Sequence, residues 1–155
     1  MTLKLSAISA VALASVLFVG SPAQAQIAYP NANAKALADC VALSTTGRDR
    51  LLIARWMALG IGSAKAMKDV VTVNPDVKDE TDKQMAAVFD RLFTVDCKAE
   101  ASEVVKAADI EGFESAGARL GLIAMQELMN DPAVTASLSD YVQYTDQDAV
   151  AQLAK

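Results

Sequence analysis

WMALGIG (residues 56–62) and LGLIAM (residues 120–125) are the two stretches that decide the fold. Neither contains a charged residue, and a helix that is apolar on all sides must be surrounded by protein. Glycine inside a helix costs about 1 kcal/mol relative to alanine, and the close approach of two backbones is the simplest compensating gain. The pattern therefore predicts two central helices that cross tightly near Gly60 and Gly121, and it predicts that Gly121→Leu strongly lowers the melting temperature.

The rest of the chain also has the spacing of helices, and no stretch sustains the period-two alternation of strands. Thr46 and Asp49 have the spacing of a capping box, Thr145 and Asp148 repeat it, and Asp131-Pro132 is a helix start. We expect helices over about residues 34–43, 47–70, 77–94, 98–109, 113–129 and 132–144, and a short last one to residue 153. The sequence thus predicts an all-α protein, a single helical bundle of about six helices.

Several side chains have an expected place in this bundle. Trp56, the only tryptophan, is expected in the core, with a ligand pocket as the alternative. Tyr141 and Tyr144 are expected to lay the sixth helix on the bundle, and Gly112 is expected to separate the fourth helix from the fifth. The methionines beyond residue 25 are expected to fill the core rather than to bind Cu(I): Met57, Met67, Met85, Met125 and Met129.

The first 25 residues have the three parts of a Sec signal peptide. A basic residue, Lys4, precedes an apolar run over residues 5–20, and Ala23-Gln24-Ala25 follows. The run is shorter than the roughly 20 apolar residues that a membrane anchor needs. We expect cleavage after Ala25, with Ala23 as the alternative site, and therefore a periplasmic or secreted protein with no stable membrane anchor after cleavage.

The expected mature protein has two parts. Residues 26–33 include a proline and read as a flexible leader, and residues 34–155 read as one helical domain. Its two cysteines, Cys40 and Cys97, lie in the exported part, where an even count predicts one disulfide. A redox couple and a metal site are the alternatives, but the first normally uses C-x-x-C spacing and the second needs further ligands.

Composition excludes several classes of function. The chain has no histidine, which removes Ser-His-Asp and Cys-His catalysis, histidine-ligated metals and C-x-x-C-H haem attachment. Without Lys4, 13 basic residues face 19 acidic ones, and this net charge of −6 argues against nucleic-acid binding, which needs clustered basic residues. We expect no cofactor, no metal site and no catalytic residue.

TTGRDR (residues 45–50) is the most distinctive polar stretch. Thr45, Thr46, Arg48 and Arg50 at the start of a helix could hold a phosphate or carboxylate, which makes them the candidate ligand-binding residues. The alternative is a capping box with salt bridges to acidic residues of a neighbouring helix. The spacing is not that of a Walker motif, because the second glycine and the Lys-Ser/Thr pair are missing.

The motif C-x4-TTGRDR-x5-W (residues 40–56), together with AMQELM (residues 124–129) and Asp131-Pro132, resembles a family of small secreted proteobacterial proteins of uncharacterised function. The resemblance spans most of the mature domain. It implies a periplasmic location and brings no known activity. The chain departs from that family at Ala64-Lys65, where members tend to carry a His-Pro pair, so no role of that histidine is carried over.

Three functions remain open on these grounds. The first is a non-catalytic periplasmic helical domain that binds an unknown protein partner or a small ligand, including an anionic one. The second is an enzyme that uses carboxylates with Arg48 or Arg50. The third is a small acid-stress chaperone, which should unfold and bind clients at low pH.

Overall fold

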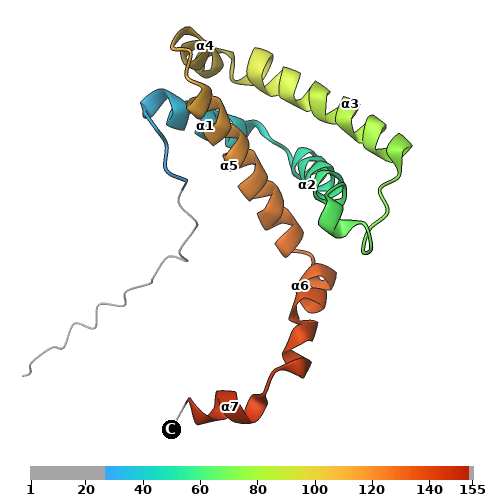
Figure 1. Cartoon of the computed structure of the whole chain (residues 1–155). Helices are drawn as coiled ribbons and strands as arrows, with labels where there is room; N and C mark the ends of the chain where they lie inside the picture. The colour runs from blue at the N-terminus through green and yellow to red at the C-terminus, as the bar shows by residue number, and fades with distance from the viewer. Residues whose placement is uncertain (1–26, 154–155) are drawn as a thin grey trace, which may run out of the picture.

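The computed structural model describes residues 27–153, and over this range the protein is all-α and contains no strand (Figure 1). The predicted fold class is confirmed. The predicted signal peptide and its cleavage site lie outside the described residues. The helices are α1 (Ala32–Ser44), α2 (Gly47–Gly62), α3 (Pro75–Arg91), α4 (Lys98–Lys106), α5 (Ile110–Met129), α6 (Pro132–Ser139) and α7 (Gln147–Gln152), with short turns η1 (Lys65–Met67), η2 (Leu92–Asp96) and η3 (Asp140–Tyr144).

The core lies among α1 to α5. The helix α1 packs against α5 and α4, and α2 packs against both α5 and α3 (Figure 1). The largest fully buried side chains come from every one of these helices and from η2: Leu37, Val41, Ile53, Met85, Leu92, Val104 and Leu120. The helix expected over about residues 77–94 is present as α3, and its residues at three- and four-residue intervals, Thr81, Met85 and Val88, are buried in this core.

The helix α2 ends at Gly62, and the prediction that it continues to about Val70 is wrong. The following connection folds back over the end of α2 and buries Gly62. A Cβ atom on Gly62 would lie 3.0 Å from a methyl group of Val73 and 3.2 Å from one of Val71. Val71 and Val73, which lie beyond the predicted end of the helix, thus cover the last turn of α2.

The helix α5 begins at Ile110, so the prediction that Gly112 separates two helices is also wrong. Gly112 lies in the first turn of α5, where its N–H donates a 2.9 Å hydrogen bond to the capping carboxylate of Asp109. A Cβ atom there would lie 2.5 Å from that carboxylate. Asp109 also accepts a 2.7 Å hydrogen bond from the side chain of Asn31, the cap of α1. The glycine thus lets one carboxylate join the starts of two helices.

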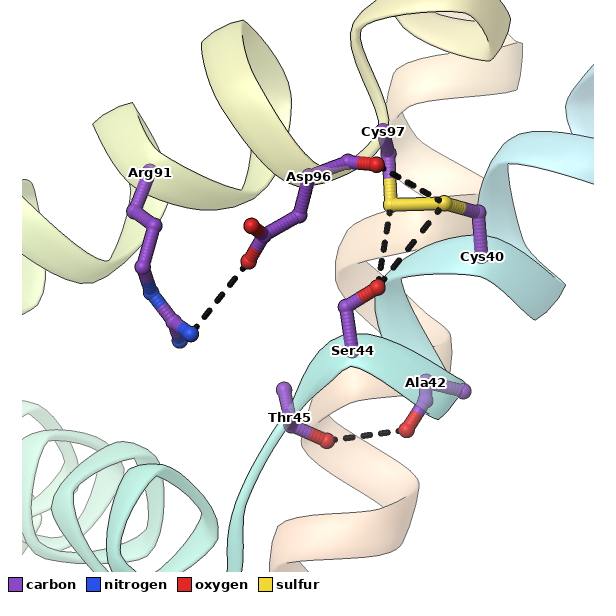
Figure 2. The surroundings of a disulfide bond; sticks show 7 residues. All are labelled: Cys40, Ala42, Ser44, Thr45, Arg91, Asp96 and Cys97. Carbon is purple, nitrogen blue, oxygen red and sulfur yellow. Dashed lines mark hydrogen bonds and ion pairs between the residues drawn. A yellow bond between two sulfur atoms is a disulfide. The ribbon is translucent and has the colours of Figure 1, made fainter.

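The predicted disulfide between Cys40 and Cys97 is confirmed. It joins α1 to the residue between η2 and α4, with the two Cα atoms 5.8 Å apart. Figure 2 shows the hydroxyl of Ser44 beside the bond, 3.6 Å from the sulfur of Cys97. Cys97 is fully buried, so the bond fastens η2 to the core.

Residues 131–153, here called the C-terminal arm, lead away from the bundle (Figure 1). No side chain of the arm is buried. Tyr141 is 66% exposed and Tyr144 is 83% exposed, so the prediction that they pack on the bundle is wrong. The predicted start at Asp131-Pro132 is confirmed, but α6 ends at Ser139. The helix α7 is capped by Asp146, not by Thr145.

Candidate functional site

The TTGRDR segment forms the start of α2, and its contacts are those of a helix cap. The capping box of Thr46 and Asp49 is present. Thr45 is buried, and its hydroxyl donates a 2.9 Å hydrogen bond to the carbonyl oxygen of Ala42 (Figure 2). The same hydroxyl accepts a 3.4 Å hydrogen bond from Nε of Arg50. Ligand binding by this segment stays a prediction.

Asp49 is the electrostatic centre of this cap. Its carboxylate accepts hydrogen bonds of 2.8 Å from the backbone N–H and from the hydroxyl of Thr46. It also forms a 2.8 Å ion pair with Arg91 of α3. Burial opposes the ionisation of Asp49, but these donors outweigh it and hold its pKa below the ordinary aspartate value. The cap of α2 is therefore tied to α3 by a charged group.

The two candidate arginines have different surroundings. Arg48 is exposed. Arg50 lies 3.8 Å from Glu127 of α5 and lines a pocket of about 360 Å³ between α1, α2 and α5. Arg119 lines the same pocket, and its Nε atom is buried without a hydrogen-bond partner among residues 27–153. Sequence reasoning missed Arg119, because nothing local marks a single arginine on an apolar helix.

A second and larger opening, here called the apolar cleft, lies on the other side of α5. Its volume is about 630 Å³. It lies between α2, α3 and α5, the helices that diverge below α4 in Figure 1. Among residues 27–153, no charged side chain lines it. The lining residues are Ile27, Ile53, Trp56, Met57, Met85, Phe89, Gly117, Ala118, Leu120, Gly121 and Leu122.

Two glycines keep the wall of the apolar cleft bare. Gly117 and Gly121 lie one turn apart on α5, and a Cβ atom on Gly117 would meet nothing within 4 Å. A Cβ atom on Gly121 would lie 3.6 Å from the end of the Met57 side chain, an ordinary contact. Gly60 also has nothing within 4 Å. The predicted tight crossing at Gly60 and Gly121 is therefore wrong, because a methionine side chain lies at Gly121 and Gly60 is open.

Trp56 is in the cleft wall rather than in the core, which corrects the prediction and favours its ligand-pocket alternative. The side chain is 37% exposed. Its indole N–H donates a 3.0 Å hydrogen bond to Asp82 of α3. The ring meets Phe89 edge-on, with 6.2 Å between the ring centroids. The single polar group of the tryptophan is thus satisfied outside the cleft, and its apolar face is left for the opening.

The apolar surface continues beyond the cleft in two directions. A smaller pocket of about 340 Å³ lies along α2, where Gly60 and Ile61 join Trp56 and Met57 and the charged Lys78 of α3 forms one side. Met125 and Met129 of α5 are exposed, so the prediction that the methionines fill the core holds for Met85 but not for these two. Exposed methionines suit a surface that adapts to what it contacts.

Within residues 27–153, no group of three or more His, Cys, Asp or Glu side chains is placed to hold a metal ion. No helix of the described range is long and apolar enough to cross a membrane.

Comparison of the chain with protein-family models, with curated proteins and with solved structures gives no match. The resemblance carried by the C-x4-TTGRDR-x5-W motif therefore stays a prediction.

Proposed function

We propose that the protein is a non-catalytic binding module of the cell envelope, and that it holds a small apolar molecule in the apolar cleft. The observation that carries the proposal is the cleft itself, which has a volume of about 630 Å³ and, among the described residues, no charged side chain in its lining. Ligand sites typically measure about 300–1,000 Å³ and are lined mainly by apolar and aromatic side chains. The location in the envelope is proposed from the signal peptide together with the disulfide.

The lining determines the chemistry of the ligand. Burial of apolar surface contributes about 25 cal/mol per Å², so covering about 300 Å² of a ligand would contribute about 7.5 kcal/mol before the cost of association. A charged group would lose its hydration in the cleft without gaining a partner, because the N–H of Trp56 already donates to Asp82. The preferred ligand is therefore uncharged where it lies against Trp56 and the two glycines.

The contacts of the acidic residues favour binding over catalysis. An enzyme built on Arg48 or Arg50 would need free carboxylates beside them. Instead Asp49 pairs with Arg91 at 2.8 Å, and Glu127 lies 3.8 Å from Arg50. These carboxylates serve the cap of α2 and the contact between α2 and α5.

A titration with N-phenyl-1-naphthylamine, an uncharged aromatic probe that brightens in apolar surroundings, tests the proposal. We expect saturable binding by the mature chain and at least tenfold weaker binding by Gly121→Leu, whose side chain would project into the cleft. Gly47→Leu is the matched control, because Gly47 is outside the cleft lining and has nothing within 4 Å. Equal binding by all three proteins would refute the cleft as the site.

The pocket that contains Arg50 supports a second candidate, a small carboxylate or phosphate. Its lining also includes the carboxylates of Asp39, which pairs with Lys35, and of Glu127, with which the anion would compete for Arg50. The specific observation is that Nε of Arg119 is buried without a partner among the described residues, beside an Arg50 whose ion pair is long. A thermal-shift titration with citrate and phosphate tests it. We expect a rise in melting temperature that Arg50→Gln abolishes, and no rise in the wild-type chain would contradict this candidate.

A further inference from the structure

The pocket that contains Arg50 carries equal numbers of positive and negative side chains. Arg50 of α2 and Arg119 of α5 supply two positive charges. Asp39 of α1 and Glu127 of α5 supply two negative charges, so the charged lining of the pocket sums to zero. A simple anion or a simple cation is attracted by one pair and repelled by the other. A zwitterion, which carries one group of each sign, is attracted by both pairs.

The two arginines have donors available for a ligand. The Nε atom of Arg119 is buried without a hydrogen-bond partner among residues 27–153. Nε of Arg50 donates a long 3.4 Å bond to Thr45, and Nη1 of Arg50 lies 3.8 Å from Glu127, which is beyond hydrogen-bond distance. A buried donor without an acceptor is costly, and a guanidinium group matches the two oxygens of a carboxylate. A carboxylate is therefore the acceptor that these donors favour.

The two acidic side chains are accessible to an ammonium group. Asp39 contacts Lys35 through Oδ2, and the two residues lie four apart on the exposed side of α1. Exposed pairs of this kind contribute little to stability, so a ligand ammonium can share Asp39 with Lys35. Glu127 lies 3.8 Å from Arg50, a distance that leaves its oxygens able to accept a shorter hydrogen bond. An ammonium group has three donors, which is enough for both carboxylates.

Apolar side chains complete the lining of this pocket. Ala42 and Leu43 come from α1, and Ile123 comes from α5. Ala42 and Ile123 are buried, whereas Leu43 is 86% exposed, so a ligand that covers Leu43 removes apolar surface from water. The volume of about 360 Å³ lies at the lower end of the range of ligand pockets. The pocket therefore suits a small molecule with one short apolar side chain.

We propose that this pocket binds a free amino acid with an aliphatic side chain. The two arginines pair with its α-carboxylate, the two acidic side chains pair with its α-ammonium group, and its side chain lies against Leu43 and Ile123. The inference rests on the proposed anion site at Arg50 and narrows its ligand from any small anion to a zwitterion. It does not depend on the apolar cleft, whose lining shares no residue with this pocket.

Isothermal titration calorimetry of the mature chain with L-leucine tests the assignment, together with two analogues that each lack one charge. Isocaproate keeps the carboxylate and the side chain, and isoamylamine keeps the ammonium group and the side chain. We expect saturable binding of leucine and at least tenfold weaker binding of both analogues. No binding of leucine would overturn the inference, and so would an analogue that binds as tightly as leucine.

Two variants test whether leucine binds in this pocket. Arg119→Gln removes the guanidinium with the unsatisfied donor, and Asp39→Asn removes one partner of the ammonium group, so each should weaken leucine binding at least tenfold. Asp79→Asn is the matched control for Asp39→Asn, because Asp79 pairs with Lys83 four residues away on α3 and is outside the pocket lining. This control should bind leucine like the wild type. Unchanged binding by both pocket variants would overturn the inference.

The outcomes separate this inference from the proposed function. A chain that responds to citrate or phosphate through Arg50 but does not bind leucine would overturn the amino acid and leave the anion site in place. A chain that binds neither leucine nor an anion would contradict both. Leucine binding that Gly121→Leu abolishes would move the ligand to the apolar cleft and would also overturn the inference.

Discussion

The indole N–H of Trp56 and the carboxylate of Asp82 form a 3.0 Å hydrogen bond that joins α2 to α3 at the apolar cleft. Lys78 donates a 2.5 Å hydrogen bond to the same carboxylate. The bond from Lys78 lowers the pKa of Asp82. Partial burial opposes this shift and the bond from Trp56 adds to it, so that the pKa lies below the ordinary aspartate value. The charged acceptor therefore persists at neutral pH and fixes the ring in the cleft wall.

The first prediction concerns the mobility of this ring. Asp82→Ala removes the acceptor, so we expect the side chain of Trp56 to sample more orientations and to be quenched more efficiently by acrylamide. Asp82→Asn keeps an acceptor, so its quenching constant should lie between those of the wild type and Asp82→Ala. Because the chain has one tryptophan, its fluorescence reports this position alone. Identical quenching constants for all three proteins would show that the bond does not fix the ring.

The second prediction concerns Asp49 and pH. Its folded-state pKa is lowered, so its contribution to stability is fully present above the unfolded pKa near 3.8 and is lost as the pH falls through the folded value. We expect Asp49→Asn to reduce the free energy of unfolding by about 1 kcal/mol at pH 7, and to flatten the decline below pH 4. Urea unfolding at several pH values measures both. An unchanged pH profile in the variant would contradict the assignment.

The third prediction concerns the disulfide. It closes a loop with a sequence separation of 57 residues, for which the chain-entropy model gives a stabilisation of about 4 kcal/mol. We expect the Cys40→Ser/Cys97→Ser variant to unfold at a clearly lower urea concentration than the oxidised chain. Reduced wild-type protein should behave like the variant. A urea midpoint of the variant equal to that of the oxidised chain would contradict a stabilising role of the disulfide.

The fourth prediction revises the expectation for Gly121→Leu. A Cβ atom at Gly121 would meet only the end of Met57 at 3.6 Å, and the cleft offers room for the rest of the side chain. We therefore expect the melting temperature to stay within about 5 °C of the wild type. A large loss of stability would instead support the original expectation of a tight crossing of α2 and α5 at Gly121. Gly60→Ala, in open space, should raise stability by about 1 kcal/mol.

The features that the sequence predicted correctly depend on residues close together in the chain or, like the disulfide, have only one possible pairing. The capping box of Thr46 and Asp49 is set by a spacing of three residues. The disulfide followed from the presence of two cysteines in a chain with an expected signal peptide. The third helix, expected over about residues 77–94, followed from helical period alone, and Met85 and Val88 lie on its buried face.

The cleft could not be predicted because it depends on how far apart the helices are. Trp56 has the same local sequence whether α3 and α5 close over it or diverge. Gly117 and Gly121 were visible as a spaced pair of glycines, but a bare helix face permits either a close crossing or an opening. The end of α2 was missed for the same kind of reason, because Val71 and Val73 return to cover Gly62.

The most direct test of the central claim uses the single indole N–H resonance of Trp56 in a ¹H–¹⁵N NMR spectrum. During a titration of the mature chain with N-phenyl-1-naphthylamine, we predict a saturable shift of this peak with the same dissociation constant as the fluorescence titration. The shift should disappear in Gly121→Leu and persist in Gly47→Leu. A peak that does not move while the probe binds would show that the apolar cleft is not the binding site.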